Sequence, residues 1–409
     1  MAIQEIAIKD IVYREDLYPR QEVDNNLIEK YQQSVELLPP IKINQVNILI
    51  DGRHRWNAHQ RAGATSIKAE IIQTESEAHL EILAYELNSL HGKQLTNAEK
   101  KKFAVKKCEL LTIKEISRII LVQERTVRDW THTKRKELEE YRNERIFADN
   151  LRAWNTQADI AEKYGVSRQT VSDIIKKYAE NGKIAKSGEI LDFKPFPYSI
   201  WNLAKSDETS YFGAFPKVYM ENLLYYFTEL MSTVYDPFSG NGTSVDVCKA
   251  MRRRYYCSDR IVIPGREDDI KQWDIADGLP EDLPLPDLAF LDPPYWVQAE
   301  NKYSKDSQDL ANMSLDNFYA TFEGFLKELI GRKAKKIAIV IQPTQYKNYL
   351  TYEDHIFHFA KVLEAKYKIE MRCILPYSSQ QYNAQMVEKA KEKKICLGLH
   401  RDLVIWRLV

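Results

Sequence analysis

The spacing of apolar and polar residues changes along the chain and divides it into three segments. In the first, residues 1–92, short strand-like stretches alternate with helical ones. A largely apolar run predicts a buried strand at 46–50, and the following residues predict a helix over about 56–62 and a second strand at 65–72. A turn at 88–95 closes this segment.

The second segment, from 96 to about 187, has helical periodicity throughout. It contains an internal repeat offset by 44 residues, in which 112–130 aligns without gaps to 156–174. Each copy opens with a capping box, a Thr followed three residues later by an acidic residue. We therefore expect two related helical units in tandem.

The third segment alternates strand-like runs with helical ones, an order typical of a parallel α/β sheet. The expected strands are 233–235, 254–258, 288–291, 336–341, 369–375 and 402–408. The expected boundary before this segment is 182–188, followed by Pro195 and Pro197.

These patterns predict a multidomain chain with an α+β domain at 1–93, an all-α region at 94–187 and an α/β domain at 195–409. The length of 409 residues agrees with this division, because a single core rarely grows that large.

Cysteine usage and hydropathy exclude several classes of protein. The five cysteines are scattered without a Cys-x-x-Cys pair, which argues against a disulfide scaffold and a Cys-rich zinc module. No run approaches 18 apolar residues, and the first residues lack a signal-peptide layout. We therefore expect a protein of the reducing cytoplasm with no membrane partner and no metal.

The net charge is zero, but its distribution is uneven. Residues 94–186 hold 21 Lys and Arg against 14 Asp and Glu. A basic middle in a neutral chain indicates a local DNA or RNA contact surface. The alternative is a solvated, lysine-rich helical face.

The two repeats have the order of helix-turn-helix units. In the second copy, Gly165 suits a left-handed turn and Ser167 caps the next helix, while the first copy has Leu121 and Gln123 at these places. Arg and Gln can read base edges, and Ser and Thr often contact phosphates. The alternative is a helical pair used only for packing. The candidate DNA-binding residues are Arg168, Gln169, Thr170, Ser172, Arg125 and Arg128.

In the first segment, Asp51 to Gly63 (DGRHRWNAHQRAG) follows a strand and opens a helix, a geometry that suits a phosphate. Together with Pro19-Arg20, this motif resembles the N-terminal domain of ParB-type partition proteins and their sulfiredoxin-like relatives. The resemblance implies a nucleotide, CTP or ATP, with Gly52, Arg53, His54 and Arg55 at its phosphates. Alternatively, the two arginines pair with carboxylates of their own domain.

The third segment carries four blocks that indicate chemistry. DPFSGNGTS at 236–244 joins a strand to a helix, and Asp259 ends the next strand, where it can accept ribose hydroxyls. WDIAD at 273–277 offers an aromatic face and a carboxylate to an adenine ring, although Trp273 also fits ordinary packing. The fourth block, Asp292-Pro-Pro-Tyr, closes an apolar strand.

These blocks, in this order, resemble S-adenosylmethionine-dependent DNA amino-methyltransferases. The resemblance implies a Rossmann-like sheet of seven strands, a C-terminal hairpin near Cys396 and 402–408, and a helix at 216–226 that contacts the methionine end of S-adenosylmethionine. The cofactor-binding residues that it implies are Asp236, Phe238, Gly240, Gly242, Thr243, Asp259, Asp274 and Pro216.

The residue types of the fourth block fit the chemistry of amine methylation. Asp292 and the carbonyl of Pro293 can accept the two N–H bonds of an exocyclic amine, Pro294 stiffens the turn, and Tyr295 offers a face for a flipped base. Asp-Pro-Pro-Tyr favours adenine N6, with cytosine N4 as the nearest alternative.

No separate target-recognition domain fits between the glycine block and Asp292. The candidates for sequence reading are the loop 297–314, the helix-turn-helix pair and the segment 377–394. Two other functions remain open: a DNA-binding regulator with an inactive methylase fold, and an RNA or protein amino-methyltransferase. We expect double-stranded DNA as the partner. The sequence leaves the oligomeric state open, a dimer included.

Overall fold

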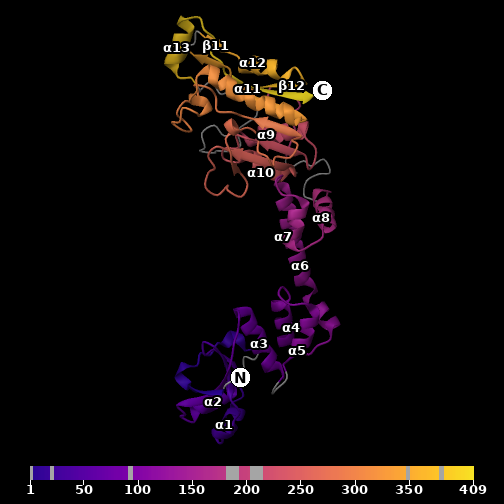
Figure 1. The fold of residues 1–409 in the computed structure, drawn as a ribbon, viewed down its shortest axis with the longest axis vertical. Helices are drawn as coiled ribbons and strands as arrows, with labels where there is room; N and C mark the ends of the chain where they lie inside the picture. Colours follow the sequence, from indigo (N-terminus) through magenta and orange to yellow (C-terminus); the bar gives the residue numbers. More distant parts are fainter. Residues whose placement is uncertain are drawn as a thin grey trace. The chain divides into compact units, whose positions relative to one another are not determined.

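The computed structural model describes residues 3–18, 23–90, 95–180, 193–202, 215–346, 351–376 and 382–409. Pro19, Arg20 and the expected boundary at 182–188 lie outside the described residues. The chain forms two compact units, Met1–Tyr141 and Arg142–Val409 (Figure 1). Within the described ranges, no helix is both long enough and apolar enough to cross a membrane.

The first unit contains a four-stranded sheet with the order β1-β4-β2-β3. Its strands are β1 (Ile3–Ala7), β2 (Ile41–Asn44), β3 (Leu49–Asp51) and β4 (Ser66–Ile72). Its first three α-helices are α1 (Asn25–Gln32), α2 (Arg53–Arg61) and α3 (Glu77–Leu90). Ile41, Ile43, Leu49 and Ile50 are fully buried in the core beneath this sheet.

The structure corrects three predicted boundaries in this unit. The strand predicted at 46–50 begins at Leu49, because Asn47 has a positive φ of 60° in the turn after β2 and Val46 is exposed. The helix predicted from residue 56 begins at Arg53, directly after Gly52. The turn predicted at 88–95 starts too early, since α3 continues to Leu90.

Five helices follow over 97–180. They are α4 (Asn97–Lys107), α5 (Ile113–Ile120), α6 (Glu124–Leu151), α7 (Gln157–Tyr164) and α8 (Arg168–Glu180). The predicted capping boxes are present at Thr96, Thr112 and Thr156. The boundary between the two compact units falls within α6, so α5 belongs to the first unit and α7 and α8 to the second.

The second unit is built on a seven-stranded sheet with the order β12-β13-β9-β8-β5-β6-β7. The strands are β5 (Thr233–Asp236), β6 (Arg254–Asp259), β7 (Lys271–Gln272), β8 (Leu288–Leu291), β9 (Lys336–Ile341), β12 (Tyr367–Pro376) and β13 (His400–Leu408). The short strands β10 (Thr344–Tyr346) and β11 (Thr351–Glu353) pair separately.

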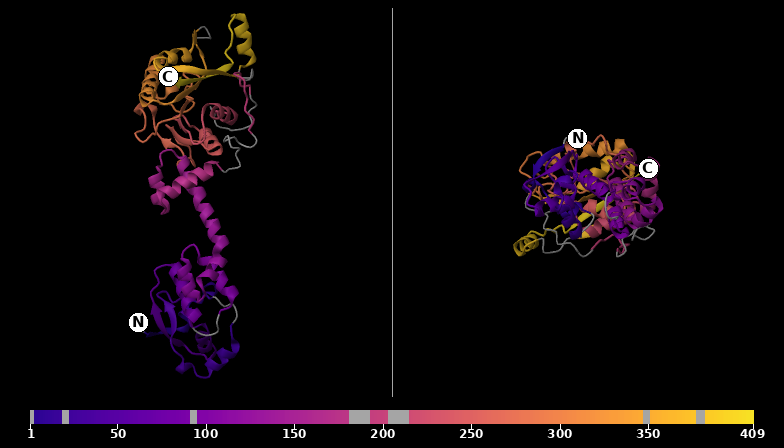
Figure 2. Two further views of the ribbon diagram at one scale, coloured as in Figure 1. Left: turned by 90° about the vertical axis from the view of Figure 1, so that its right-hand side faces the viewer. Right: turned by 90° about the horizontal axis from the view of Figure 1, so that it is seen from below.

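Helices cover both faces of this sheet (Figures 1 and 2). On one face, α11 (Leu315–Arg332) and α12 (His355–Leu363) pack against Ile337 and Ile339; on the other, α9 (Lys217–Phe227) and α10 (Thr243–Met251) pack with Ala338 and Val340. Alternate residues of β9 therefore enter opposite cores, which explains why the strand is apolar from Ile337 to Ile341. A further helix, α13 (Ala384–Glu392), precedes β13.

The six predicted strands are all present, and the predicted helix at 216–226 is α9, but two details differ. The sheet is mixed rather than parallel, because β13 runs antiparallel to both β9 and β12. The C-terminal hairpin pairs β13 with β12, and Cys396 lies outside the strands. β13 lies between β9 and β12, and apolar periodicity alone does not distinguish its antiparallel pairing from a parallel one.

Candidate functional site

Three carboxylates mark one edge of the seven-stranded sheet. Asp236 ends β5, Asp259 ends β6 and Asp292 directly follows β8. These strands are parallel neighbours, so their carboxyl ends meet at the same edge. Motifs 56 positions apart in the sequence are thereby brought together.

The glycine block forms the turn between β5 and α10. Gly240 donates its backbone N–H to the Asp259 carboxylate at 2.8 Å, and Phe238 donates to Asp236 at 2.9 Å. Gly242 has a φ of 87° and precedes Thr243, the first residue of α10. A Cβ atom at Gly242 would lie 3.1 Å from the Arg266 guanidinium, so conformation and close approach both favour glycine here.

The environment of this edge shifts the pKa of its acids upward. Burial raises the pKa of Asp236 to about 7 against hydrogen bonds from Ser244 and Phe238, and the nearby carboxylates of Asp259 and Asp292 add to the rise. Burial likewise raises the pKa of Asp292 to about 6, although Arg401 and the Tyr295 hydroxyl oppose it. An edge with three acids and restricted solvation favours a cationic ligand.

Asp292 lies within a short hydrogen-bonded turn. The hydroxyl of Tyr295 donates to its carboxylate at 3.1 Å. Pro293 is buried, while Pro294 and Tyr295 are half-buried. This turn therefore holds the Asp292 carboxylate and an aromatic ring beside each other at the sheet edge.

Sequence reasoning missed Arg401, which lies on β13 and opposes the rise in the pKa of Asp292. Its guanidinium is buried over the rings of Phe215 and Tyr219, with centroids at 5.5 and 5.9 Å. No local motif marks this residue, because its relation to Asp292 arises only when β13 inserts into the sheet beside β9.

The remaining predicted cofactor residues lie around the same strands. Pro216 precedes α9, and Asp274 follows β7, where it accepts from the backbone of Ala276 and pairs with Arg260 at 3.1 Å. The neighbouring Trp273 is half-buried and donates its indole N–H to the carbonyl of Gly278 at 2.9 Å. Its partial exposure suits both ordinary packing and contact with a flat ring.

The residues present fit S-adenosylmethionine. The glycine turn lets a ligand approach the backbone, and the acidic edge suits a molecule that carries sulfonium and ammonium charges. Each Asp259 carboxylate oxygen already accepts one backbone N–H, from Gly240 or Ile261, and an ionised oxygen has a second acceptor position for a hydroxyl.

The predicted recognition loop at 297–314 is held by its own hydrogen bonds. Asn312 donates to the carbonyls of Ser304 and Asp306, and Asp306 pairs with Arg260. Arg260 thus joins this loop to Asp274. Only residues 382–394 of the third candidate segment are described, and they include α13.

The helical repeats leave four of their six candidate residues exposed, and Thr170 and Ser172 are half-buried. In the second copy, Gly165 has a φ of 61°, and Ser167 accepts the backbone N–H of Thr170 at 3.0 Å. Arg168 and Gln169 are exposed at the start of α8, with Ser172 half-buried on the same helix. In the first copy, Leu121 adopts a φ of 52°, and the candidate residues on α6 are the exposed Arg125 and Arg128.

The three consecutive arginines Arg252 to Arg254 serve the fold. Arg253 is 2% exposed and donates to the carbonyls of Leu224, Thr228 and Met251. Arg252 and Arg254 donate to backbone carbonyls of the segment 150–179.

In the first unit, an open cavity of about 1810 Å³ is lined by Gly52, Arg53, His54 and Arg55. The Arg55 guanidinium donates to Asp51 at 2.9 Å and to the carbonyls of Pro39 and Pro40. Arg53 lies over the ring of Tyr13 at 5.0 Å. Arg55 therefore pairs with a carboxylate of its own domain, which is the alternative that the sequence left open.

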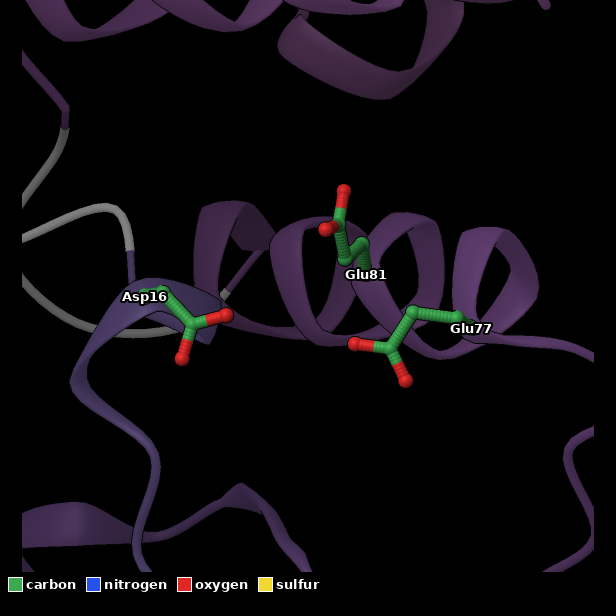
Figure 3. Close-up of side chains that lie close together, drawn as sticks. All are labelled: Asp16, Glu77 and Glu81. Atoms are coloured by element: carbon green, nitrogen blue, oxygen red, sulfur yellow. The ribbon is translucent and has the colours of Figure 1, made fainter.

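Among the described residues, one group of carboxylates is close enough to consider a metal: Asp16, Glu77 and Glu81, with oxygens within 4.8 Å of one another (Figure 3). Arg14 pairs with Asp16 and Glu77, and Glu81 pairs with Lys106 and Lys107. Because these cations already balance the acids, the cluster is explained without a metal.

Comparisons with known proteins match the two parts of the chain separately. Residues 1–87 match the family model of the ParB N-terminal domain, and residues 96–261 match that of a DNA methylase. The second match spans α4 to α8, the glycine block and Asp259, and it ends before Asp292. A search of curated proteins found no significant match.

Several solved structures are similar to parts of the chain. A ParB from Caulobacter crescentus complexed to the centromeric parS site is 19% identical, covering 42% of this chain and 99% of that one, with a TM-score of 0.25. Sulfiredoxin from Arabidopsis thaliana is 24% identical over 18% of this chain and 88% of that one, with a TM-score of 0.17. A type I restriction-modification methyltransferase subunit from Streptococcus thermophilus is 14% identical, covering 82% and 70%, with a TM-score of 0.29.

These TM-scores are too low to carry an argument, so the assignment rests on the two family models. They confirm the resemblances drawn from DGRHRWNAHQRAG and from the glycine block. The chain joins a ParB N-terminal domain to a DNA methylase domain of the type that modifies exocyclic amino groups.

Proposed function

We propose that this protein is a site-specific DNA methyltransferase that modifies the exocyclic amine of a flipped base, adenine N6 in preference to cytosine N4. The observation that carries the proposal is the meeting of Asp236, Asp259 and Asp292 at the carboxyl ends of three adjacent parallel strands. The Asp-Pro-Pro-Tyr form of the fourth block supports adenine over cytosine.

In this proposal the methyl donor is S-adenosylmethionine, which supplies an electrophilic methyl group when bound. The residues that would hold it are Asp236, Phe238, Gly240, Gly242, Thr243, Asp259, Asp274 and Pro216. The glycine turn lets the ligand lie against the backbone, and Asp259 accepts its ribose hydroxyls.

The chain's own residues then prepare the base. The ionised Asp292 carboxylate and the carbonyl of Pro293 accept the two N–H bonds of the amine, which frees its lone pair and aims it at the methyl group. The ring of Tyr295 stacks on the base that has left the duplex. The Tyr295 hydroxyl, 3.1 Å from Asp292, holds this carboxylate in place.

The test uses DNA from a methylation-deficient bacterium that expresses the full chain. Modified bases are mapped by single-molecule sequencing, with Asp292→Ala beside the natural protein and Asp316→Ala, an exposed acid on α11, as a matched control. N6-methyladenine at one motif that only Asp292→Ala abolishes is the expected result. N4-methylcytosine would overturn the base assignment, and undiminished transfer by Asp292→Ala would overturn the mechanism.

We further propose that the chain divides by function at 1–93, 94–187 and 195–409, with the middle segment shared between the two compact units. Both helical repeats are helix-turn-helix units in this proposal, and they bind double-stranded DNA. The exposed candidate residues at the starts of α8 and α6 support this assignment, as does the basic charge of this segment.

We also propose that the first-unit cavity binds a nucleotide, CTP or ATP. Its support is the position of Gly52, Arg53 and His54 at the start of α2, on the cavity wall. Arg55 already bonds to Asp51 and to two backbone carbonyls, so its role is structural. The phosphates are therefore bound by the backbone at the start of α2 and by the side chains of Arg53 and His54.

Calorimetry of CTP and ATP with the full chain tests this site. Arg53→Ala should weaken nucleotide binding at least tenfold, because a guanidinium–phosphate contact is lost. Arg61→Ala, at the far end of the same helix, should leave it unchanged. Absence of binding to the natural protein would overturn the proposal.

A further inference from the structure

The two helical repeats, although related in sequence, belong to different compact units. The first copy, α5 and the start of α6, is part of Met1–Tyr141, whereas α7 and α8 belong to Arg142–Val409 with the seven-stranded sheet. The second pair is therefore the one that shares a body with Asp292.

Apolar contacts fix this pair to the sheet domain. Phe147 and Leu151, at the end of α6, pack in one core with α9 and α10, and Tyr178 of α8 packs against it. The rings of Phe147 and Tyr178 stack with centroids 5.9 Å apart. Arg252 donates to the carbonyl of Ala179 at 3.2 Å, so α8 is held near its end as well.

The backbone after α6 is bonded to the sheet itself. Ala153 donates its N–H to the carbonyl of Tyr255 in β6 at 2.8 Å. Arg254 donates to the carbonyls of Asn150 and Ala153, each at 3.1 Å. The ring of Trp154 packs edge-on against Tyr256 at 5.5 Å. The turn between α6 and α7 is therefore bonded to the first half of β6, at the end of that strand away from Asp259, and is not a free linker.

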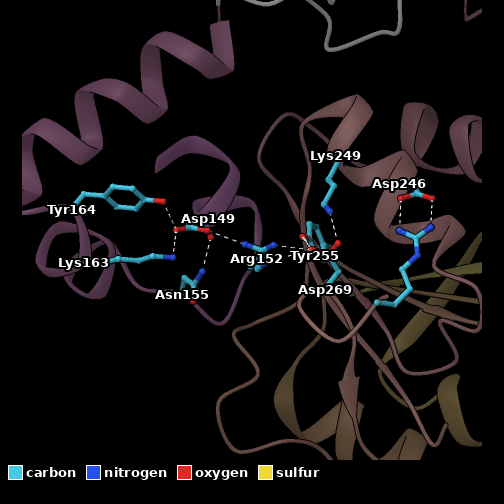
Figure 4. Close-up of polar contacts among 10 residues, drawn as sticks. Asp149, Arg152, Asn155, Lys163, Tyr164, Asp246, Lys249, Tyr255 and Asp269 are labelled. Carbon is cyan, nitrogen blue, oxygen red and sulfur yellow. Dashed lines mark hydrogen bonds and ion pairs between the residues drawn. The ribbon is translucent and has the colours of Figure 1, made fainter. Parts of the chain in front are cut away.

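A chain of ion pairs completes the attachment (Figure 4). Lys163 and Tyr164 of α7 each donate to Asp149 at 2.8 Å, and Arg152 links Asp149 to Asp269. Asp269 also accepts from Lys249 and from the Tyr255 hydroxyl.

The two carboxylates in this series of ion pairs are largely buried: the side chain of Asp149 is 9% exposed and that of Asp269 is 13% exposed. Burial favours their neutral forms, but the hydrogen bonds from Lys163 and Tyr164 outweigh it and hold the pKa of Asp149 below its ordinary value. The bonds from Lys249 and Tyr255 do the same for Asp269. Both acids stay ionised at neutral pH, so the ion pairs persist.

While this face of the helical pair is anchored, the start of α8 is exposed. Val171 and Ile174 point into the small core shared with α7, and Arg168 and Gln169 face solvent. At the equivalent positions of the first copy stand Glu124 and Arg125. A leading Glu is repelled by phosphates, so of the two copies the second is better suited to a close approach to base edges.

We propose that α7 and α8 are the target-sequence reader of the methyltransferase, and that Arg168 and Gln169 determine which duplex site is methylated. This inference rests on the proposed methyltransferase function. Because the pair is fixed to the body that carries Asp292, the sequence bound by α8 sets which base reaches that residue. The first copy, in the other unit, contacts DNA without setting the methylated motif.

The test compares Arg168→Ala/Gln169→Ala with Glu124→Ala, a control at the position of the first repeat that is equivalent to Arg168. All three side chains are exposed, so both variants should fold. The full-length proteins select duplexes from a random pool, and the methylated motif is mapped in cells that express them. S-adenosylmethionine binding, measured by calorimetry, reports on the integrity of the sheet domain.

The natural protein and the control variant should select and methylate one and the same motif. Arg168→Ala/Gln169→Ala should bind S-adenosylmethionine normally but lose roughly 10- to 100-fold preference at two or more motif positions, as expected for lost side chain–base contacts. An unchanged motif in this variant, or a motif altered only by the control, would overturn the inference. If the natural protein methylates nothing, the proposed function fails, and the selected motif still decides whether α8 is the reader.

Discussion

Arg152 and Asp269, 117 positions apart, form an ion pair with a nitrogen–oxygen distance of 3.1 Å between the helical repeat and the sheet domain. Asp269 simultaneously accepts from Lys249 and the Tyr255 hydroxyl. One shielded carboxylate thus satisfies three donors from two parts of the second unit.

Asp269→Asn should therefore destabilise the second unit by about 2 kcal/mol, because it removes charge-assisted hydrogen bonds and leaves two cations less well paired. Urea unfolding of the full chain measures the loss of stability, and hydrogen exchange in peptides from α7 and β6 shows where it occurs. Asp246→Asn is the matched control: Asp246 pairs with Arg266 but is 50% exposed, so its loss should cost under about 1 kcal/mol. Equal effects of the two variants would contradict the structural role of Asp269.

Methyl transfer should depend on pH through Asp292. Burial raises the pKa of this carboxyl to about 6, and its ionised form accepts the N–H bonds of an amine more strongly than the neutral acid does. As pH falls through 6, kcat/KM should drop about tenfold per unit, while above pH 7 this group no longer limits the rate. A pH–rate profile on duplex DNA measures it. A profile that stays flat between pH 5 and 8 would contradict the role assigned to Asp292.

The same profile tests the contact between Tyr295 and Asp292. The hydroxyl donates to the carboxylate and so lowers its pKa, against the larger effect of burial. Tyr295→Phe keeps the ring but removes this donor, so the acid inflection should move to higher pH. Tyr319→Phe, which removes a hydroxyl bonded to Glu353 and His355, should leave the inflection in place. A shift to lower pH in Tyr295→Phe would contradict the geometry.

Much of the fold could be predicted because local signals and tertiary structure agree. The strands predicted at 288–291 and 336–341 are β8 and β9 at the predicted residues, since the part of a strand that is buried on both faces is a continuous apolar run. The capping boxes at Thr112 and Thr156 mark helix starts because the signal lies within four residues. The carboxylates of the candidate site were found for the same reason: each follows a recognisable strand.

Other features depend on contacts between distant residues and leave no local pattern. The strand β13 joins the sheet antiparallel, which brings Arg401 to Asp292 and β12 to the hairpin. No local pattern marks Arg253 as a buried residue. It is buried because the backbone carbonyls of Leu224 in α9 and of Thr228 just after that helix accept hydrogen bonds from its guanidinium. Val46 was predicted inside a strand although the turn at Asn47 exposes it. Periodicity does not encode these partners.

The turns of the two repeats offer a last, matched prediction. Leu121 and Gly165 occupy equivalent positions and both adopt the left-handed conformation, with φ of 52° and 61°. This conformation strains any residue that has a Cβ atom. The side chain of Leu121 is 61% exposed, so its packing contributes little stability to offset that strain. Leu121→Gly should therefore stabilise the first repeat by about 1 kcal/mol. Gly165→Ala should destabilise the second by a similar amount through conformation alone, because no atom lies within 4 Å of the added Cβ. Hydrogen exchange of α5 should become slower in Leu121→Gly, and hydrogen exchange of α7 should become faster in Gly165→Ala. Changes of the same sign in the two variants would contradict the predicted equivalence of the two turns.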